Sequence, residues 1–458
     1  MADADNSNLL SILEGAADGT WSRVNLNSFS DAWPDLADRP LSGGSHASPS
    51  AIISAWSSFA WDAARGDLLL FGGGHQNYAG NEVYRWSGSS QLWELASLPS
   101  QVTLLSGGLY VPVDGAINAP TSIHTYDNNE YLAVADRMIT LGGASYNTGG
   151  TQQIQDPGGS LRTTGPYLFD PSKADGTKVG GTTGSAVDPA VLGGQMWQNR
   201  DVRDKFSFTT SAGSLAIGNL DGTTAAVVEE GQDVVYFTGT VGGGTDKYLF
   251  RYQITDVTDP SQDTVSVIGS WFTGPVAYGA AAMDPLSGFY VSMSDTPGQP
   301  FVVWDTDTLG GVANRSQAIA LTVSGGTISD SRLAGIDWDP ATDAFWVWSG
   351  GGDVWRLEAP DSGLIGDTWS LTLVTDGDLL AANARPASDD PISGGIRGKW
   401  KYASNLGAFV ALDGITEGDI WLYRPDGWIN PVPEPGTYAL ILTGLGMVGW
   451  NLMRRRRA

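Results

Sequence analysis

The stretch from Ser58 to Leu95 has the sequence SFAWDAARGDLLLFGGGHQNYAGNEVYRWSGSSQLWEL. It contains short apolar and aromatic segments separated by Gly, Asn and Ser, at residues 58–62, 68–71, 82–86 and 92–95. Short segments of this composition, bounded by turn residues, are typical of β-strands. The pattern therefore predicts four antiparallel strands in one small sheet.

The same order of segments recurs along the rest of the chain, which indicates a repeat architecture. Later units combine apolar strands and turns with strands rich in Tyr or Trp, and we expect them at residues 124–197, 225–272, 280–323, 333–374 and 400–423. In the second unit the first strand is expected at His124–Tyr126. In the fourth unit the last strand is expected at Ala318–Val323.

The last unit lacks a fourth strand, and the segment Thr20–Val24 carries a Trp as that strand should. The sequence therefore predicts an all-β, six-bladed β-propeller over residues 20–428, closed by an N-terminal strand and preceded by an N-terminal arm, residues 1–19. The Gly-Gly strand ends, the Tyr of the third strand and the Trp of the fourth resemble Kelch repeats. This resemblance implies a propeller of the galactose-oxidase-like kind.

Composition excludes several kinds of chemistry. The chain of 458 residues has 61 Gly, 18 Trp, only 3 His and no Cys, so disulfides and thiolate metal sites are excluded. We expect no metal and no cofactor. The copper chemistry of galactose oxidases requires a cysteine bonded to a tyrosine, so that activity is not expected to carry over. A net charge of −25 repels phosphate backbones, so no nucleic-acid partner is expected.

The C-terminus combines three features in order. A Pro-rich linker, residues 429–436, precedes the apolar run Thr437–Met453, which is followed by four arginines, Arg454, Arg455, Arg456 and Arg457. About 17 helical residues span roughly 25 Å, which is marginally enough for a bilayer core. We therefore expect a transmembrane helix and a cytoplasmic tail over residues 437–458, held by the arginines. The alternative is a buried terminal core helix, which leaves four adjacent arginines without a packing role.

The tripartite tail resembles the PEP-CTERM sorting signal of Gram-negative bacteria, with Pro433, Glu434 and Pro435 as its motif. The resemblance implies that an exosortase in the inner membrane is a partner and cleaves near this motif. It also implies delivery to the cell surface or the exopolysaccharide matrix. An exported chain needs an export signal, yet Met1–Asn8 has neither a basic nor an apolar region. We expect a trimmed chain or a misassigned start codon.

One group of polar and aromatic residues is predicted to meet at the propeller axis, because the loops that carry it open on one face. The candidates for catalysis are His75, Tyr78, His124, Arg332 and Arg397, and those for ligand binding are Gln76, Asn81, Glu82 and Tyr126. His and Tyr can transfer protons, and Arg can hold a carboxylate. The alternative is structural, with His capping a blade and Arg joining neighbouring blades.

Two classes of function remain open. The first is a surface or matrix protein whose propeller binds protein partners or a polysaccharide such as exopolysaccharide. The second is a carbohydrate-active enzyme, a polysaccharide lyase or hydrolase, that acts in the axial funnel.

Overall fold

The computed structural model describes residues 5–40, 48–105, 108–146, 152–156, 158–182, 193–210, 213–216, 222–240, 247–270, 279–296, 298–307, 314–328, 331–386 and 395–431, some of them by backbone alone. Within this part of the chain, no helix is both long and apolar enough to span a membrane. The expected membrane helix, the sorting motif Pro433–Pro435 and Arg454–Arg457 lie outside the described residues.

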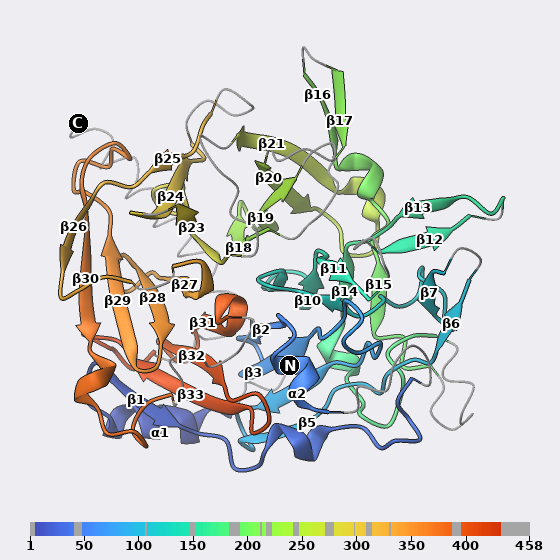
Figure 1. Cartoon of the computed structure of the whole chain (residues 1–458), viewed down its shortest axis with the longest axis horizontal. Coiled ribbons are helices and arrows are strands. Elements are labelled where there is room, and N and C mark those ends of the chain that lie inside the picture. Colours follow the sequence, from blue (N-terminus) through green and yellow to red (C-terminus); the bar gives the residue numbers. More distant parts are fainter. Residues whose placement is uncertain are drawn as a thin grey trace.

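Six sheets surround a central axis as the blades of a propeller (Figure 1). In each blade the first strand is innermost, and successive strands pair antiparallel toward the outside. Blades 1 to 3 consist of β2 (Ser58–Asp62), β3 (Asp67–Phe71), β4 (Tyr84–Ser87) and β5 (Leu92–Leu95); β9 (Asn129–Leu132), β10 (Arg137–Thr140), β14 (Tyr167–Phe169) and β15 (Trp197–Asn199); and β18 (Thr224–Glu229), β19 (Gln232–Thr240), β20 (Lys247–Ile254) and β21 (Thr264–Ser270).

The remaining blades include two strands that come from elsewhere in the chain, β26 and β1. Blades 4 to 6 consist of β22 (Ala281–Asp284), β23 (Phe289–Thr296), β24 (Gln299–Asp305) and β25 (Gln317–Ala318); β27 (Gly335–Asp339), β28 (Ala344–Gly350), β29 (Asp353–Glu358), β30 (Trp369–Thr375) and β26 (Leu321–Ser324); and β31 (Trp400–Ala403), β32 (Ala408–Asp413), β33 (Asp419–Arg424) and β1 (Thr20–Arg23).

The innermost strands contact one another in chain order, and β31 of the last blade contacts β2 of the first. The outermost strand of blade 6 is β1, which pairs antiparallel with β33 from Thr20 opposite Arg424 to Arg23 opposite Trp421. Residues more than 390 positions apart thus share one sheet. This pairing covers the edge that β33 would otherwise expose.

The hydrophobic core is divided into six clusters, each between two neighbouring blades. Strand β3 shows why its sequence is a continuous apolar run. Leu68 and Leu70 pack toward blade 6, whereas Leu69 and Phe71 pack toward blade 2. Successive side chains of a strand point to opposite faces, so a strand between two blades must be apolar on both.

Two strands differ from the sequence expectation. The first strand of blade 2 is β9, and not His124–Tyr126; His124 instead ends β8 (Ile123–His124), which pairs with β11 (Ala144–Ser145) above the blade. Residues 318–323 do not form one strand either. The chain leaves blade 4 after β25, and β26 pairs in parallel with β30 of blade 5. In both cases a short run of strand-forming residues lies at least partly in a connection between blades.

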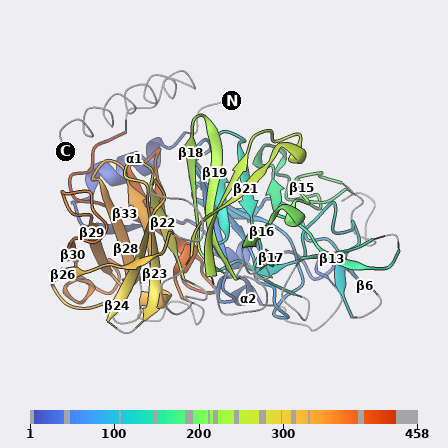
Figure 2. The same ribbon diagram turned by 90° about the horizontal axis from the view of Figure 1, so that it is seen from above.

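The two faces of the ring differ. Connections that precede a first strand or follow a second strand open on one face, which we call the axial-loop face. This face carries α2 (Ser50–Ile53), while α1 (Ser7–Gly15) lies on the opposite face (Figure 2). Insertions in blades 1 to 3 extend the axial-loop connections as two-stranded hairpins, β6–β7 (Val102–Leu104, Tyr110–Pro112), β12–β13 (Gln153–Gln155, Leu161–Thr163) and β16–β17 (Ser207–Thr210, Gly213–Ala216).

A buried ionic cluster joins the blades at the axis. Nζ of Lys401, in β31, lies 2.7 Å from Oε1 of Glu130 and 3.5 Å from Oδ1 of Asp127. The other oxygen of Asp127 accepts hydrogen bonds from the backbone nitrogens of Thr224 (3.1 Å) and Ala281 (3.0 Å). One carboxylate therefore contacts blades 3, 4 and 6 from the connection that enters blade 2.

Replacing Trp21 of β1 with Ala is expected to lower the free energy of unfolding by about 3–5 kcal/mol. The Trp21 ring packs 5.6 Å from Trp348, 5.6 Å from Trp400 and 5.0 Å from Tyr423, and its indole donates to the Gly352 carbonyl (3.1 Å). Denaturant unfolding measures the change. Leu26→Ala, at a side chain that is 70% exposed, is the control and should change stability by at most about 0.5 kcal/mol. Equal midpoints for the two variants would contradict a role for β1 in holding the last blade.

Candidate functional site

Four axial-loop connections bring one group of side chains together. Trp56 precedes β2, and His75 and Asn77 follow β3. His124 and Tyr126 precede β9, and the 3-10 helix Arg397–Lys399 precedes β31. We call these residues, with Gln76, the axial cluster.

The centre of the axial cluster is the imidazole of His124, which is 2% exposed. Its ring centroid lies 4.6 Å from Trp56, 5.0 Å from His75 and 5.9 Å from Tyr126. The Arg397 guanidinium carbon lies 5.3 Å from the Tyr126 ring centroid, a cation–π contact. Aromatic faces and a cation from four loops therefore converge on one histidine.

Hydrogen bonds orient this histidine. With its amide nitrogen toward His124, Asn77 donates to Nε2 of His124 (2.9 Å) and to the Gly74 carbonyl (3.0 Å). Burial, together with the nearby His75, Arg397 and Lys399, lowers the pKa of His124 to about 3. His124 is therefore neutral at physiological pH, so its two ring nitrogens have different roles, one donor and one acceptor.

Backbone strain is concentrated in the axial cluster. Five of its residues have left-handed backbones, with φ of 55° at Trp56, 53° at His75, 69° at Gln76, 53° at Tyr126 and 50° at Arg397. Non-glycine residues adopt this conformation at a cost of about 1–3 kcal/mol each, and they gather at binding and catalytic sites. The clustering is the strongest local indication of function in the described chain.

The strained segments are tied to one another. The backbone nitrogen of Tyr126 donates to the Trp56 carbonyl (2.6 Å), and that of Gly398 donates to the Tyr126 carbonyl (3.2 Å). A Cβ at Gly398 would lie 2.6 Å from Cβ of Ser58 and 2.9 Å from Cα of Asp127. Only glycine permits this approach, so the connection entering blade 6 is held against those entering blades 1 and 2.

The structure brings together five of the nine candidates from the sequence, namely His75, Gln76, His124, Tyr126 and Arg397. His75 and Gln76 are exposed at the rim, whereas Tyr126 and Arg397 are buried. The Arg332 side chain lies outside the described residues. Trp56, Asn77 and Lys399 were not anticipated. Trp56 could have been found, because it precedes its first strand as Tyr126 precedes β9.

The other three candidates lie in the body, because the chain turns inward after Asn77. Tyr78 packs 5.1 Å from Trp33, and Asn81 bonds the Pro120 carbonyl (2.9 Å) and the Ser100 nitrogen (2.8 Å). Glu82 is 2% exposed and accepts a hydrogen bond from the Tyr84 hydroxyl (2.6 Å). These contacts are structural in kind. Lys399 also lies in the interior, and burial lowers its pKa well below the usual range.

Glu82→Gln is expected to remove a pH dependence of folding stability. Burial raises the pKa of Glu82 to about 7 from an ordinary 4.5, so the folded state binds this proton more tightly than the unfolded state. The resulting stability, on the order of 3 kcal/mol, is present below the unfolded pKa and is lost as the pH rises through about 7. Unfolding measured from about pH 5 to 7 should show a shallower decline in the variant. The exposed Glu417→Gln is the control, and equal slopes in all three proteins would contradict the assignment.

The described residues include no group of three or more His, Asp or Glu placed to hold a metal ion. The side chains whose charges act on His124 are all basic ones, His75, Arg397 and Lys399. In a chain with a net charge of −25, this is a local exception. The site can therefore offer aromatic faces, hydrogen-bonding imidazoles and a positive charge to a ligand.

Comparison with known proteins identifies the C-terminal tail. Residues 431–457 match the PEP-CTERM protein-sorting motif. The chain therefore carries a signal for exosortase-dependent export through the membrane to the cell surface. No curated protein matches the sequence.

Solved structures match the propeller at low identity. A GH43_1 enzyme from Xanthomonas citri complexed with xylose is 10% identical, with a TM-score of 0.31, over 70% of this chain and 92% of that one. A GH32 beta-fructofuranosidase from Bombyx mori in complex with sucrose is 11% identical, with a TM-score of 0.29, over 69% of this chain and 58% of that one. Neither likeness bears on the activity of this chain.

Proposed function

We propose that the protein is an exosortase-processed surface or matrix protein whose propeller binds a polysaccharide at the axial cluster. The observation that carries this proposal is the gathering of five left-handed residues around the Trp56 and His124 rings. Strain of this kind persists where the surrounding structure holds a site ready for its ligand. The half-buried Trp56 offers an indole face for stacking against a sugar, and the exposed His75 and Gln76 offer hydrogen bonds at the rim.

The location of the site fits an exported binding protein. The last described residues, Ile429–Pro431, lie beside the turns Asp339–Thr342 and Ser404–Gly407, on the face opposite the axial loops. A propeller held by residues 437–458 in the inner membrane of a Gram-negative bacterium would direct its axial cluster away from that membrane. Cleavage near the motif Pro433–Pro435, within the linker of residues 429–436, would then release the body, residues 20–428, with the site unobstructed.

An enzymatic function is the second candidate. It is favoured by the exposed His75, whose ring centroid lies 5.0 Å from that of His124, which in turn lies 5.9 Å from Tyr126. An imidazole at the rim of the site can accept and return a proton, as lyases and hydrolases of polysaccharides require. Arg397 would hold a substrate carboxylate or the charge that develops on it.

His75→Ala and Trp56→Ala are each expected to weaken polysaccharide binding by at least about tenfold, the effect of losing about 1.4 kcal/mol of contact. The purified body is titrated with pectate and with dextran by calorimetry, and melting is measured in parallel. New reducing ends or ultraviolet absorbance from unsaturated uronate would favour the enzyme. The control is Val134→Ala, an exposed side chain on the opposite face. Unchanged polysaccharide affinity in both His75→Ala and Trp56→Ala would contradict a binding site at the axial cluster. Binding of dextran without binding of pectate would exclude an acidic ligand.

Replacing Pro433, Glu434 and Pro435 with Ala is expected to hold the protein in the inner membrane. The apolar run Thr437–Met453 still inserts, and Arg454–Arg457 still resist translocation, but the cleavage motif is gone. Cell fractionation followed by immunoblotting gives the distribution. Normal surface delivery of this variant would contradict processing at the motif.

A further inference from the structure

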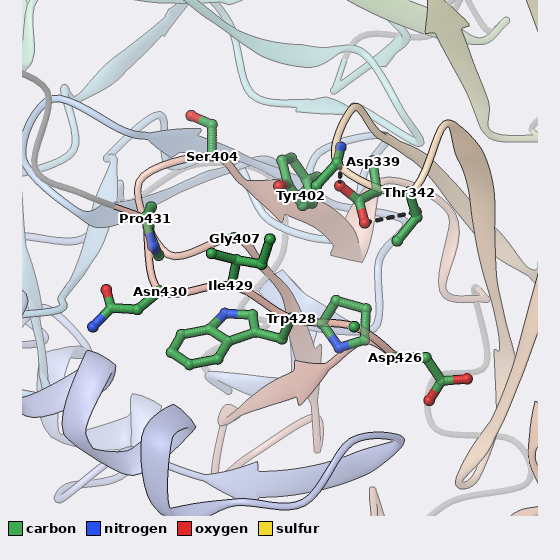
Figure 3. A pocket seen from close by; sticks show the side chains of 13 residues that line it. Asp339, Thr342, Tyr402, Ser404, Gly407, Asp426, Trp428, Ile429, Asn430 and Pro431 are labelled. Carbon is green, nitrogen blue, oxygen red and sulfur yellow. Dashed lines mark hydrogen bonds between the residues drawn. The ribbon is translucent and has the colours of Figure 1, made fainter.

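A cavity of about 270 Å³ lies on the face opposite the axial cluster, where the chain leaves the propeller (Figure 3). Its walls come from the turn after β27, the turn after β31 and the segment Pro425–Pro431. Tyr402 and Trp428 contribute aromatic surface, and Asp339 contributes a carboxylate that accepts from the Thr342 hydroxyl (2.8 Å). The cavity therefore directly adjoins the segment that leads into the sorting motif.

The segment that precedes the sorting motif contacts the propeller as far as Asn430. The Trp428 indole donates to the Leu406 carbonyl (2.8 Å), and the Arg424 guanidinium carbon lies 4.7 Å from the Trp428 ring centroid. The Asn430 amide donates to Oε1 of Glu14 in α1 (2.6 Å). These contacts hold the segment at a half-buried point, Trp428, and at an exposed one, Asn430.

Chain length then limits where the processing enzyme can work. Pro433 is the third residue after Asn430, and an extended chain advances at most about 3.6 Å per residue. Chain length therefore limits the distance from Asn430 to the first residue of the motif to about 11 Å while these contacts are made. An enzyme that encloses the motif in its active site must meet the surface of the propeller around the cavity.

We propose that this exit face, the cavity together with Ile429 and Asp426, is a docking surface for the exosortase during processing. Ile429 is 77% exposed beside the cavity, although most large apolar side chains of the described residues are buried. An exposed apolar side chain next to a cavity is the kind of anchor that protein interfaces use. The propeller body thus takes part in its own maturation.

Charge distinguishes a protein partner from the lipid surface. Glu14, Asp18 and Asp426 lie around the exit, and Arg424 is paired with Asp18 (2.9 Å). An acidic rim is repelled by anionic lipid headgroups and attracted by basic protein loops. The occupant is therefore a membrane enzyme with a basic exterior at this contact, and not the bilayer itself.

The test follows processing of the full chain in cells. Ile429→Glu removes the apolar anchor, and ten Gly and Ser residues inserted between Asn430 and Pro431 separate the body from the motif without altering either. Each change is expected to slow conversion of precursor to processed protein at least fivefold in a pulse-chase immunoblot. Leu379→Glu, at a side chain that is 83% exposed elsewhere, is the matched control and should mature at the wild-type rate.

The outcomes separate the alternatives. If the insertion variant matures at the wild-type rate or faster, the docking proposal is wrong. The propeller body would then have no effect on processing by the exosortase, or would hinder it. Binding of the purified body to phosphatidylglycerol vesicles, lost in Ile429→Glu, would also overturn it in favour of lipid. Polysaccharide binding at the opposite face is measured on the same variants and should be unchanged. Failure of docking is therefore distinguishable from failure of the proposed ligand site.

Discussion

Lys401 carries its ammonium into the closed centre of the ring, where it is only 6% exposed. Burial alone would lower the pKa of Lys401, but Glu130, Asp127 and Asp337 together raise it. A buried charge costs several kcal/mol unless its partners are in place. Glu130 comes from blade 2, Asp337 comes from blade 5, and Asp127 comes from the connection between blades 1 and 2. The ion pair is thus satisfied only when the ring is assembled. An open ring would leave this buried charge without its partners, so the ion pair favours the closed arrangement of blades.

The same constraint positions the axial cluster. Asp127 directly follows Tyr126, so the bonds that hold Asp127 at the axis also hold the connection that carries His124. Gly398 packs on Asp127, so the position of Asp127 also limits the position of the neighbouring Arg397. The strained backbones at Tyr126 and Arg397 persist because neighbouring residues have no other position available. A rigid scaffold beneath the loops thereby fixes the geometry of the site above it.

The sequence predicted the blades well where strands lie between two neighbours, because β3 and its equivalents must be apolar on both faces. It failed where side chains of the same kind occur in connections. Ile123 and His124 form a short strand outside the blade, and β26 leaves its own blade to pair in parallel with β30. For the site, topology was sufficient to bring His75, His124, Tyr126 and Arg397 together. It could not show that the chain turns inward after Asn77, which buries Tyr78, Asn81 and Glu82, because the left-handed backbone at Gln76 depends on tertiary contacts.

The two ends of the propeller axis differ in structure. At one end, loops from blades 1, 2 and 6 form a strained, aromatic and locally cationic cluster. At the other end, α1 and the turns of blades 5 and 6 hold the segment that leads to the sorting motif. Both the axial cluster and the exit segment depend on blade 6, because Arg397 directly precedes β31 and Trp428 bonds the turn after β31. The strand β1, which completes blade 6, therefore affects both ends of the axis. Pairing of Thr20–Arg23 with β33 stabilises the blade that carries both Arg397 of the axial cluster and the segment that precedes the sorting motif.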